Sequence, residues 1–241
     1  MKNKLFIFLL LPLILSAYTP SYLSLDKPMK SPFISSELNI KGNLTSDMMN
    51  DPADSFLAGN MNTGIALRTL FPGGIDIIAG YDSYYRDVSV TGAWSWIPMF
   101  SFISTRITLT GYSTEQSGSR ESGVNSTAMV NLNAGNALNC FIAAHYDMHN
   151  DFLAGTGIMI GLPLEFLYFE RAGIIGEYYF LTLPAGAGDP VYKAALFFKT
   201  WGHQFFITLS NSPASNIRTF AEGGDNNALH AGFAVRRYFE F

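Results

Sequence analysis

The end of the chain, from Leu229 to Phe241, alternates between two kinds of side chain with a period of two. One face is mostly apolar and ends in aromatic rings: Ala231, Phe233, Val235, Arg237, Phe239 and Phe241. The other face carries small and polar side chains: His230, Gly232, Ala234, Arg236, Tyr238 and Glu240. Because successive side chains of a β-strand point to opposite faces, this segment is predicted to be a strand between an apolar and a polar environment.

The composition of the whole chain agrees with strands that cross a membrane. Charged residues make up only 14% of the 241 residues, whereas soluble domains average about 25%. Beyond the first residues, no run of about 18 apolar residues indicates a membrane helix. An all-β fold, a transmembrane antiparallel up-and-down β-barrel, accounts for both observations, because only every second residue of its strands faces lipid.

The alternation recurs and predicts about twelve strands. The clearest is Asp87–Trp96, with Val88 and Val90 on the face that also carries Trp94 and Trp96, which suit an aromatic girdle at the membrane interface. The predicted strands are 33–41, 62–71, 75–82, 87–96, 101–112, 125–133, 137–147, 152–170, 173–183, 190–200, 203–210 and 229–241.

The connections between these strands alternate in length. At one end we expect loops over 42–60, 83–86, 113–123, 148–151, 184–189 and 211–227, which include all the long ones. At the other end we expect tight turns at 72–74, 98–100, 134–136, 171–173 and 201–202. Pro72-Gly73-Gly74 supplies the backbone angles of such a turn. Outer-membrane barrels have short periplasmic turns and longer outer loops, so the pattern supports an even strand number.

The beginning of the chain has the pattern of a secretory signal peptide. Lys2 and Lys4 precede an apolar run, and Ser16-Ala17 provides small residues for cleavage. We therefore predict a signal peptide over 1–17, a periplasmic lead-in over 18–31 and one barrel domain over 32–241, in the outer membrane of a Gram-negative cell. The competing fold is a soluble β-sandwich or lipocalin-like barrel, which would need more charge on its outer face.

The segment Leu196–Phe239, and more weakly the segment Asn62–Trp96, resembles uncharacterised outer-membrane β-barrel families of Gram-negative bacteria. The motifs of the first segment are Phe197-Phe198-Lys199-Thr200-Trp201-Gly202-His203-Gln204-Phe205 and Ala231-Gly232-Phe233-Ala234-Val235-Arg236-Arg237-Tyr238-Phe239. The resemblance implies that the general outer-membrane assembly machinery inserts the chain after recognising its aromatic last strand. The residues of this expected assembly signal are Phe233, Val235, Tyr238, Phe239 and Phe241.

Several charged residues fall on the faces expected to line the barrel interior. They are Asp76, Asp82, Asp87, Arg106, Glu177, His230, Arg236 and Glu240. Opposite charges in a barrel interior can line a selective constriction or neutralise one another. We expect a porin-like passive channel for small solutes, with a non-conducting structural or surface-interaction barrel as the alternative.

Other chemistry has less support in the sequence. His145, Asp147 and His149 recur at every second position and could ligate a divalent metal, although polar lining residues give the same pattern. A membrane-embedded lipid-modifying enzyme is a third alternative, but Gly-x-Ser-x-Gly is absent and no Ser–His spacing stands out. We predict no catalytic residues and no cofactor. The expected partners are membrane lipid and lipopolysaccharide, and the absence of a basic stripe argues against nucleic acid.

Overall fold

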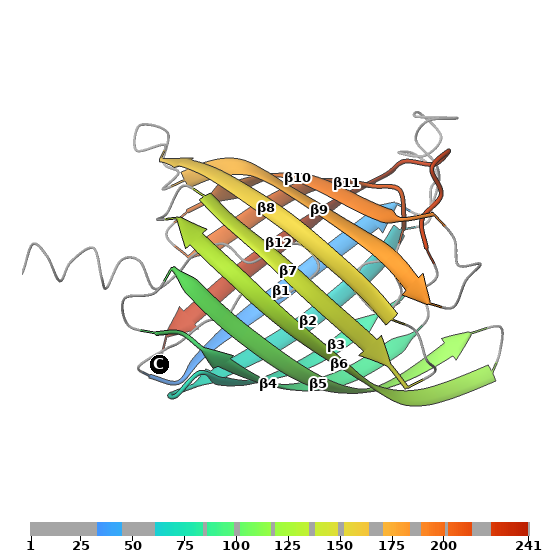
Figure 1. Ribbon diagram of the computed structural model, residues 1–241, viewed down its shortest axis with the longest axis horizontal. Helices are drawn as coiled ribbons and strands as arrows, with labels where there is room; N and C mark the ends of the chain where they lie inside the picture. The colour runs from blue at the N-terminus through green and yellow to red at the C-terminus, as the bar shows by residue number, and fades with distance from the viewer. Residues whose placement is uncertain are drawn as a thin grey trace, which may run out of the picture.

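The computed structural model describes residues 33–44, 61–83, 86–98, 102–116, 119–134, 138–148, 152–163, 171–183, 189–200, 202–213 and 223–240. Their strands form one closed antiparallel barrel in which each strand pairs with its neighbours in sequence and β1 pairs with β12 (Figure 1). The predicted signal peptide and lead-in lie outside the described residues. Within these ranges, no helix is long and apolar enough to cross a membrane.

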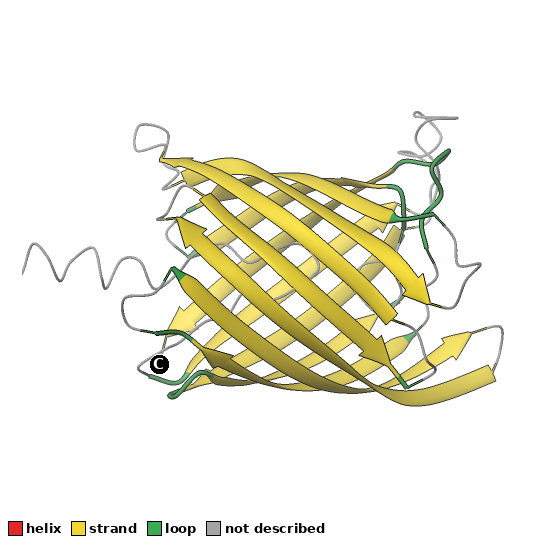
Figure 2. Ribbon diagram, in the orientation of Figure 1, coloured by secondary structure: helices red, strands yellow, loops and turns green. Residues whose placement is uncertain are grey.

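The barrel has twelve strands, as predicted, and they run diagonally around its wall (Figures 1 and 2). Their bounds are β1 Ser35–Leu44, β2 Met61–Phe71, β3 Ile75–Asp82, β4 Asp87–Trp96, β5 Ile103–Gln116, β6 Ser119–Ala134, β7 Leu138–Asp147, β8 Phe152–Pro163, β9 Arg171–Leu183, β10 Val191–Lys199, β11 His203–Ser210 and β12 His230–Glu240.

The barrel closes between its first and last strands. Ser35 is the partner of Glu240 and Ile40 is the partner of Val235, and the antiparallel register is continuous from 35 to 43. Closure gives every strand of the wall two neighbours. This arrangement satisfies backbone N–H and C=O groups that could find no partner in hydrocarbon.

The two faces of the wall differ in the way that the period of two predicts. Outward-facing side chains of β4 and β5 are apolar and exposed, including Val90, Trp94, Ile107 and Leu109. Arg106, between two outward positions on β5, points inward and is buried. A polar interior behind an apolar outer face is the arrangement expected of a wall that stands in lipid.

The two ends of the barrel differ in their connections, and we call them the turn end and the loop end. The turn end carries the connection at 72–74 and the paired residues Ser35 and Glu240, and the loop end is the opposite end, where β1 ends, β2 begins, β11 ends and β12 begins (Figure 1). The predicted tight turn after Pro72 is confirmed, since Gly73 and Gly74 have φ of 90° and 83°. The segregation of the two longest connections at one end is also as predicted.

Two of the predicted connections are wrong. The segment 171–173 is not a turn but the start of β9, and β8 ends at Pro163 rather than continuing to 170. The segment 113–123 is not a loop, because β5 and β6 continue through it to Gln116 and from Ser119. The strand count is unaffected, since both errors move a boundary within an existing pair.

The continued part of β5 and β6 forms a hairpin extension that projects beyond its neighbours at the loop end (Figure 1). Pairing of β4 with β5 stops at Ser113, and pairing of β6 with β7 stops at Asn125. Beyond these residues the two strands pair only with each other, for example Glu115 with Arg120. The side chains of the extension are predominantly polar, which fits a segment surrounded by water.

Candidate functional site

The interior of the barrel is divided between an apolar and a polar side. Side chains from β6 to β12 form one buried apolar cluster, called here the interior apolar cluster: Met129, Phe141, Ala143, Leu153, Met159, Ile175, Tyr179, Val191, Ala195, Phe197, Phe206 and Ala234. The inward faces of β1 to β5 carry mainly polar and charged groups. The interior is therefore less uniformly polar than the sequence suggested.

Aromatic rings of the interior apolar cluster lie against inward-facing glycines of neighbouring strands. A Cβ atom at Gly155 of β8 would collide with the ring of Tyr179 on β9, and one at Gly157 would collide with the ring of Phe141 on β7. The ring of Phe197 covers Gly173 in the same way. These glycines allow large rings to lie flat on the wall, close to the backbone.

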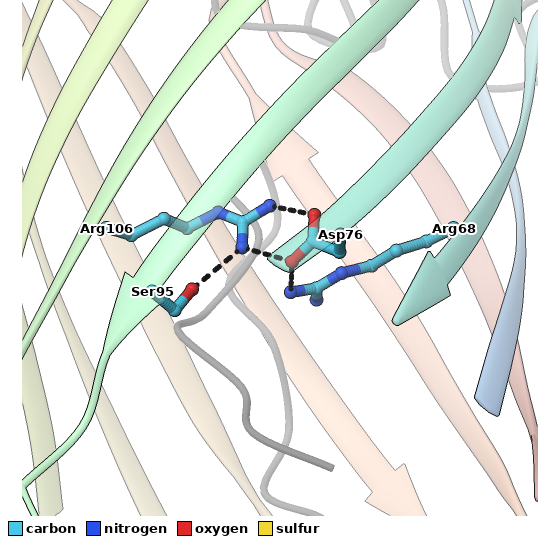
Figure 3. A network of polar contacts seen from close by, with 4 residues as sticks. All are labelled: Arg68, Asp76, Ser95 and Arg106. Carbon is cyan, nitrogen blue, oxygen red and sulfur yellow. Dashed lines mark hydrogen bonds and ion pairs between the residues drawn. The ribbon is translucent and has the colours of Figure 1, made fainter. Parts of the chain in front are cut away.

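The tightest polar cluster of the interior lies at the turn end and joins β2, β3, β4 and β5 (Figure 3). Arg106 donates two hydrogen bonds to the two carboxylate oxygens of Asp76, at 2.5 and 2.7 Å, and a third to the hydroxyl of Ser95 at 3.1 Å. Arg68 donates to the same carboxylate at 2.7 Å. The ion pairs are buried, which strengthens their electrostatic interaction relative to water.

In this Asp76 cluster, the guanidinium groups of Arg68 and Arg106 both bind the single carboxylate of Asp76. Bidentate pairing fixes the guanidinium plane of Arg106, which reaches the carboxylate from two strands away, and Arg68 approaches the same carboxylate from the neighbouring strand β2. Glu37 of β1 is the cross-strand partner of Arg68 and is also buried. The arrangement can brace the turn end mechanically and can hold positive charge at the wall of the interior.

Other predicted lining residues lie nearer the loop end. Asp87 and Asp82 are cross-strand partners on β4 and β3, and both are buried. Glu177 on β9 is the partner of Lys193 on β10, and its carboxylate accepts a hydrogen bond of 3.2 Å from the Tyr179 hydroxyl. These residues place carboxylates on opposite parts of the wall.

The three remaining predicted lining residues lie on β12. Arg236 points inward and is buried, and its guanidinium carbon Cζ lies 5.3 Å from the centre of the Phe206 ring. The Nδ1 atom of His230 lies 3.2 Å from the carbonyl oxygen of Leu44. The backbone of Glu240 pairs with Ser35, while its side chain lies outside the described residues.

The proposed metal ligands are partly described. His145 points inward and shares a hydrogen bond of 2.8 Å between its Nδ1 and the Thr127 hydroxyl. Asp147 also points inward and accepts a hydrogen bond of 2.9 Å from the Tyr112 hydroxyl. His149 lies outside the described residues. Among those that the structure describes, no three His, Cys, Asp or Glu side chains gather as a metal site would require.

The predicted assembly signal occupies both faces of β12. Phe233 points outward and is exposed, and Val235 and Phe239 lie on the same face. Tyr238 lies on the inward face, and its backbone N–H donates to the carbonyl of Gly202. Phe241 lies outside the described residues. The lone cysteine, Cys140, lies on the outward face of β7.

The start of the connection between β11 and β12 folds into the loop end of the barrel. Asn211 and Ser212 are buried. The carbonyl of Pro213 lies 3.3 Å from the side-chain nitrogens of both Asn43 on β1 and Asn62 on β2. This segment therefore reaches past β12 and is anchored on β1 and β2, across the pairing of β1 with β12.

Some interior residues were missed by the sequence analysis. Arg68, Glu37, Lys193 and Lys199 are all buried on inward faces. The signal for Arg68 was present, because the period of two places it on the face of Asn62 and Gly64. For Lys193 and Lys199 the signal is weaker, because neighbouring inward and outward residues of β10 are both apolar and hide the alternation.

Comparisons with known proteins bear on this architecture. No protein-family model matches the chain, and no curated protein sequence matches it. Among solved structures, a KdgM porin has a TM-score of 0.56 at 9% identity, over 85% of this chain and 99% of the porin. A NanC porin has a TM-score of 0.52 at 12% identity, over 85% of this chain and 100% of that one.

A third similar structure is LpxR from Salmonella typhimurium, with a TM-score of 0.51 at 8% identity over 85% of this chain and 100% of LpxR. The fold is that of an outer-membrane porin-like barrel. At these identities the likeness concerns the fold, since one barrel architecture supports many activities.

Proposed function

We propose that the protein is a passive channel of the outer membrane that carries small solutes through a narrow interior. The observation that supports this most directly is the polar inward face of β1 to β5, which faces the interior of a closed barrel whose outer face is apolar. Buried polar side chains in this position provide hydrogen-bonding partners for a solute or for water. The proposal assigns no catalytic step to the chain.

The alternative, a non-conducting barrel, has its own observation in favour. Inward-facing charged residues are almost fully buried, including Asp76 at 0% and Glu177 at 3% exposure. Such burial, together with the interior apolar cluster and the inward course of residues 211–213, points to an interior that is closely filled. The proposed channel is therefore narrow, and we expect a unitary conductance below that of a wide water-filled porin.

Single-channel recording in a planar bilayer tests the channel. A cysteine is placed at Ala66, which is half-buried on the inward face of β2, in a Cys140→Ser background. The matched control places a cysteine at Leu67, which is outward and exposed. We expect discrete current steps that a water-soluble thiol reagent reduces only in the Ala66→Cys variant. A folded barrel without current steps would overturn the channel and favour the structural alternative.

The outer face and the last strand indicate where the protein lies and which partners it meets. We propose that the exposed apolar girdle around Trp94 and Trp96 lies in the outer membrane, in contact with lipid and lipopolysaccharide. We further propose that the general assembly machinery inserts the barrel through β12. Fractionation of cells, with detection in the outer membrane and its loss when β12 is removed, tests both.

A further inference from the structure

The charged side chains inside the barrel are sorted by sign along its axis. Nearest the turn end, the described inward-facing charges are mainly basic: Arg68, Arg106, Arg171, Lys199 and Arg236, against the acidic Glu37 and Asp76. Farther along the same strands, toward the loop end, they are mainly acidic: Asp82, Asp87, Asp147 and Glu177, against the basic Lys41 and Lys193. The excess charge of the interior is thus positive near the turn end and negative toward the loop end.

Cross-strand pairing makes each region continuous around part of the wall. At the turn end, Arg171 pairs with Lys199, Lys199 with Gln204, and Gln204 with Arg236. Three basic groups on β9, β10 and β12 therefore form one row. On the other side of the barrel, the Asp76 cluster adds two guanidinium groups at a similar depth.

The acidic region is likewise shared between strands. Asp82 and Asp87 are cross-strand partners, so two carboxylates face the interior side by side on β3 and β4. Asp147 follows on β7 and Glu177 on β9. The described residues of the connections beside this region add the exposed Asp189 and Asp225, and also Arg86, whose charge is paired with Glu115. The loop end therefore presents acid both inside the barrel and at its rim.

We propose that this arrangement makes the channel bipolar, so that it conducts ions better in one direction of voltage than in the other. The inference rests on the proposed channel function. Fixed charge behind a low-dielectric wall concentrates counter-ions, so anions gather at the turn end and cations at the loop end. A voltage positive on the loop-end side drives both populations toward the middle and raises the current, whereas the opposite voltage depletes the middle.

The same sorting assigns a class of solute to each region. At the turn end, arginine and lysine side chains face the interior from opposite parts of the wall. This region suits carboxylate or phosphate groups, because guanidinium groups pair with these oxyanions. The loop end suits cationic or amine groups. A small solute that carries both charges can satisfy both regions, and we propose zwitterionic solutes over singly charged ones.

Current–voltage recording of single channels in about 0.1 M and about 1 M KCl tests the bipolar interior, because the Debye length falls from about 10 Å to about 3 Å. We expect currents at opposite voltages to differ by about twofold or more in dilute salt, and to approach equality in concentrated salt. The double variants Lys199→Gln/Arg236→Gln and Asp82→Asn/Asp87→Asn should each reduce the asymmetry. The control Arg237→Gln removes the neighbouring outward charge and should leave the asymmetry unchanged.

A chemical measurement reads the local potential without any current. Single cysteines replace Asn133, on the inward face near the turn end, and Ser89, on the inward face toward the loop end, in the Cys140→Ser background. The rate of an anionic thiol reagent divided by that of a cationic reagent of the same size should be higher at 133 than at 89. Equal or reversed ratios would overturn the bipolar interior.

The outcomes separate the two proposals. Current steps of equal size at both voltages, unaffected by the charge variants, leave the channel intact and overturn the bipolar interior. A folded barrel without current steps and without labelling at 89 or 133 overturns both. Heat-modifiable migration on gels establishes folding for every variant. Uptake by liposomes then tests the solute class, with the zwitterion glycine betaine compared with acetate and with tetramethylammonium, and faster uptake of either ion overturns that assignment.

Discussion

The guanidinium group of Arg106 on β5 donates hydrogen bonds to both carboxylate oxygens of Asp76 on β3, across the intervening strand β4 (Figure 3). Ser95 of β4 contributes a hydroxyl to the same guanidinium. The pair links strands that are not neighbours in the wall. The pair therefore resists sliding of β3 relative to β5. Backbone pairing alone opposes that sliding only indirectly, through β4.

Replacement of Asp76 by Asn is expected to destabilise the barrel strongly. The change leaves two buried guanidinium groups without the anion between them, and breaking one partner of a buried ion pair costs about 3–5 kcal/mol. Urea unfolding in lipid vesicles, followed by tryptophan fluorescence, measures the loss. Glu115→Gln, in the exposed pair with Arg86, should cost less than about 1 kcal/mol. Equal losses in the two variants would contradict the prediction.

A methyl group at Gly155 is expected to displace the ring of Tyr179 and to lower stability by about 1–3 kcal/mol, the usual cost of overpacking. The free energy of unfolding of Gly155→Ala measures this effect. The control is Gly92→Ala, because a Cβ atom at Gly92 would have no neighbour within 4 Å. The double variant Gly155→Ala/Tyr179→Ala should show non-additive losses, since removal of the ring also removes the collision.

The register of the seam predicts a specific cross-link. Cysteines at Ile40 and Val235 are direct partners across β1 and β12 and should form a disulfide in the Cys140→Ser background. Cysteines at Ile40 and Ala234 should not, because Ala234 points to the inward face. The altered mobility of the oxidised protein on a gel reports the bond. A bond in the second pair alone would mean that the register is shifted by one residue.

The exposure of Trp94 and Trp96 on the outward face predicts that both side chains contact lipid near the membrane interface. Trp94 and Trp96 are exposed near the turn end of β4, where an aromatic girdle is expected. In a Trp201→Phe variant, brominated lipids should quench fluorescence from both residues. A quencher placed near the headgroups should be more effective than one at the bilayer centre. Strong quenching by a water-soluble reagent instead would place this face outside the membrane.

The sequence predicts the fold well wherever one face meets lipid and the other meets polar groups. The strand at Asp87–Trp96 has the predicted bounds, because its outward residues are apolar and its inward residues are Asp, Ser, Thr and Ala. The prediction is poorer where this contrast disappears. In β8, inward Met159 and outward Ile158 are both apolar, so the end of the strand could not be located by periodicity.

The opposite loss of contrast occurs in the hairpin extension, where both faces are polar. Ser113–Gly123 therefore has the composition of a loop, although the backbones of residues 113–116 and 119–123 are paired. For the interior, the period of two predicts which face Asp76 and Arg106 occupy. It cannot predict that Arg68 joins them, because that contact depends on how far the Arg68 side chain of β2 extends along the neighbouring strand β3. The sorting of charge by depth requires the register of all twelve strands at once.

The hairpin extension gives this closed wall something that a barrel otherwise lacks, namely open edges. Beyond Ser113 and Val124, β5 and β6 each expose one row of backbone hydrogen-bonding groups to water. Open edges invite pairing with another chain, and Glu115, Arg120 and Glu121 supply the charges that discourage it. Among the described strands, only this hairpin extension can therefore pair with a strand of another chain. Such a partner would have to carry charges complementary to those of Glu115, Arg120 and Glu121.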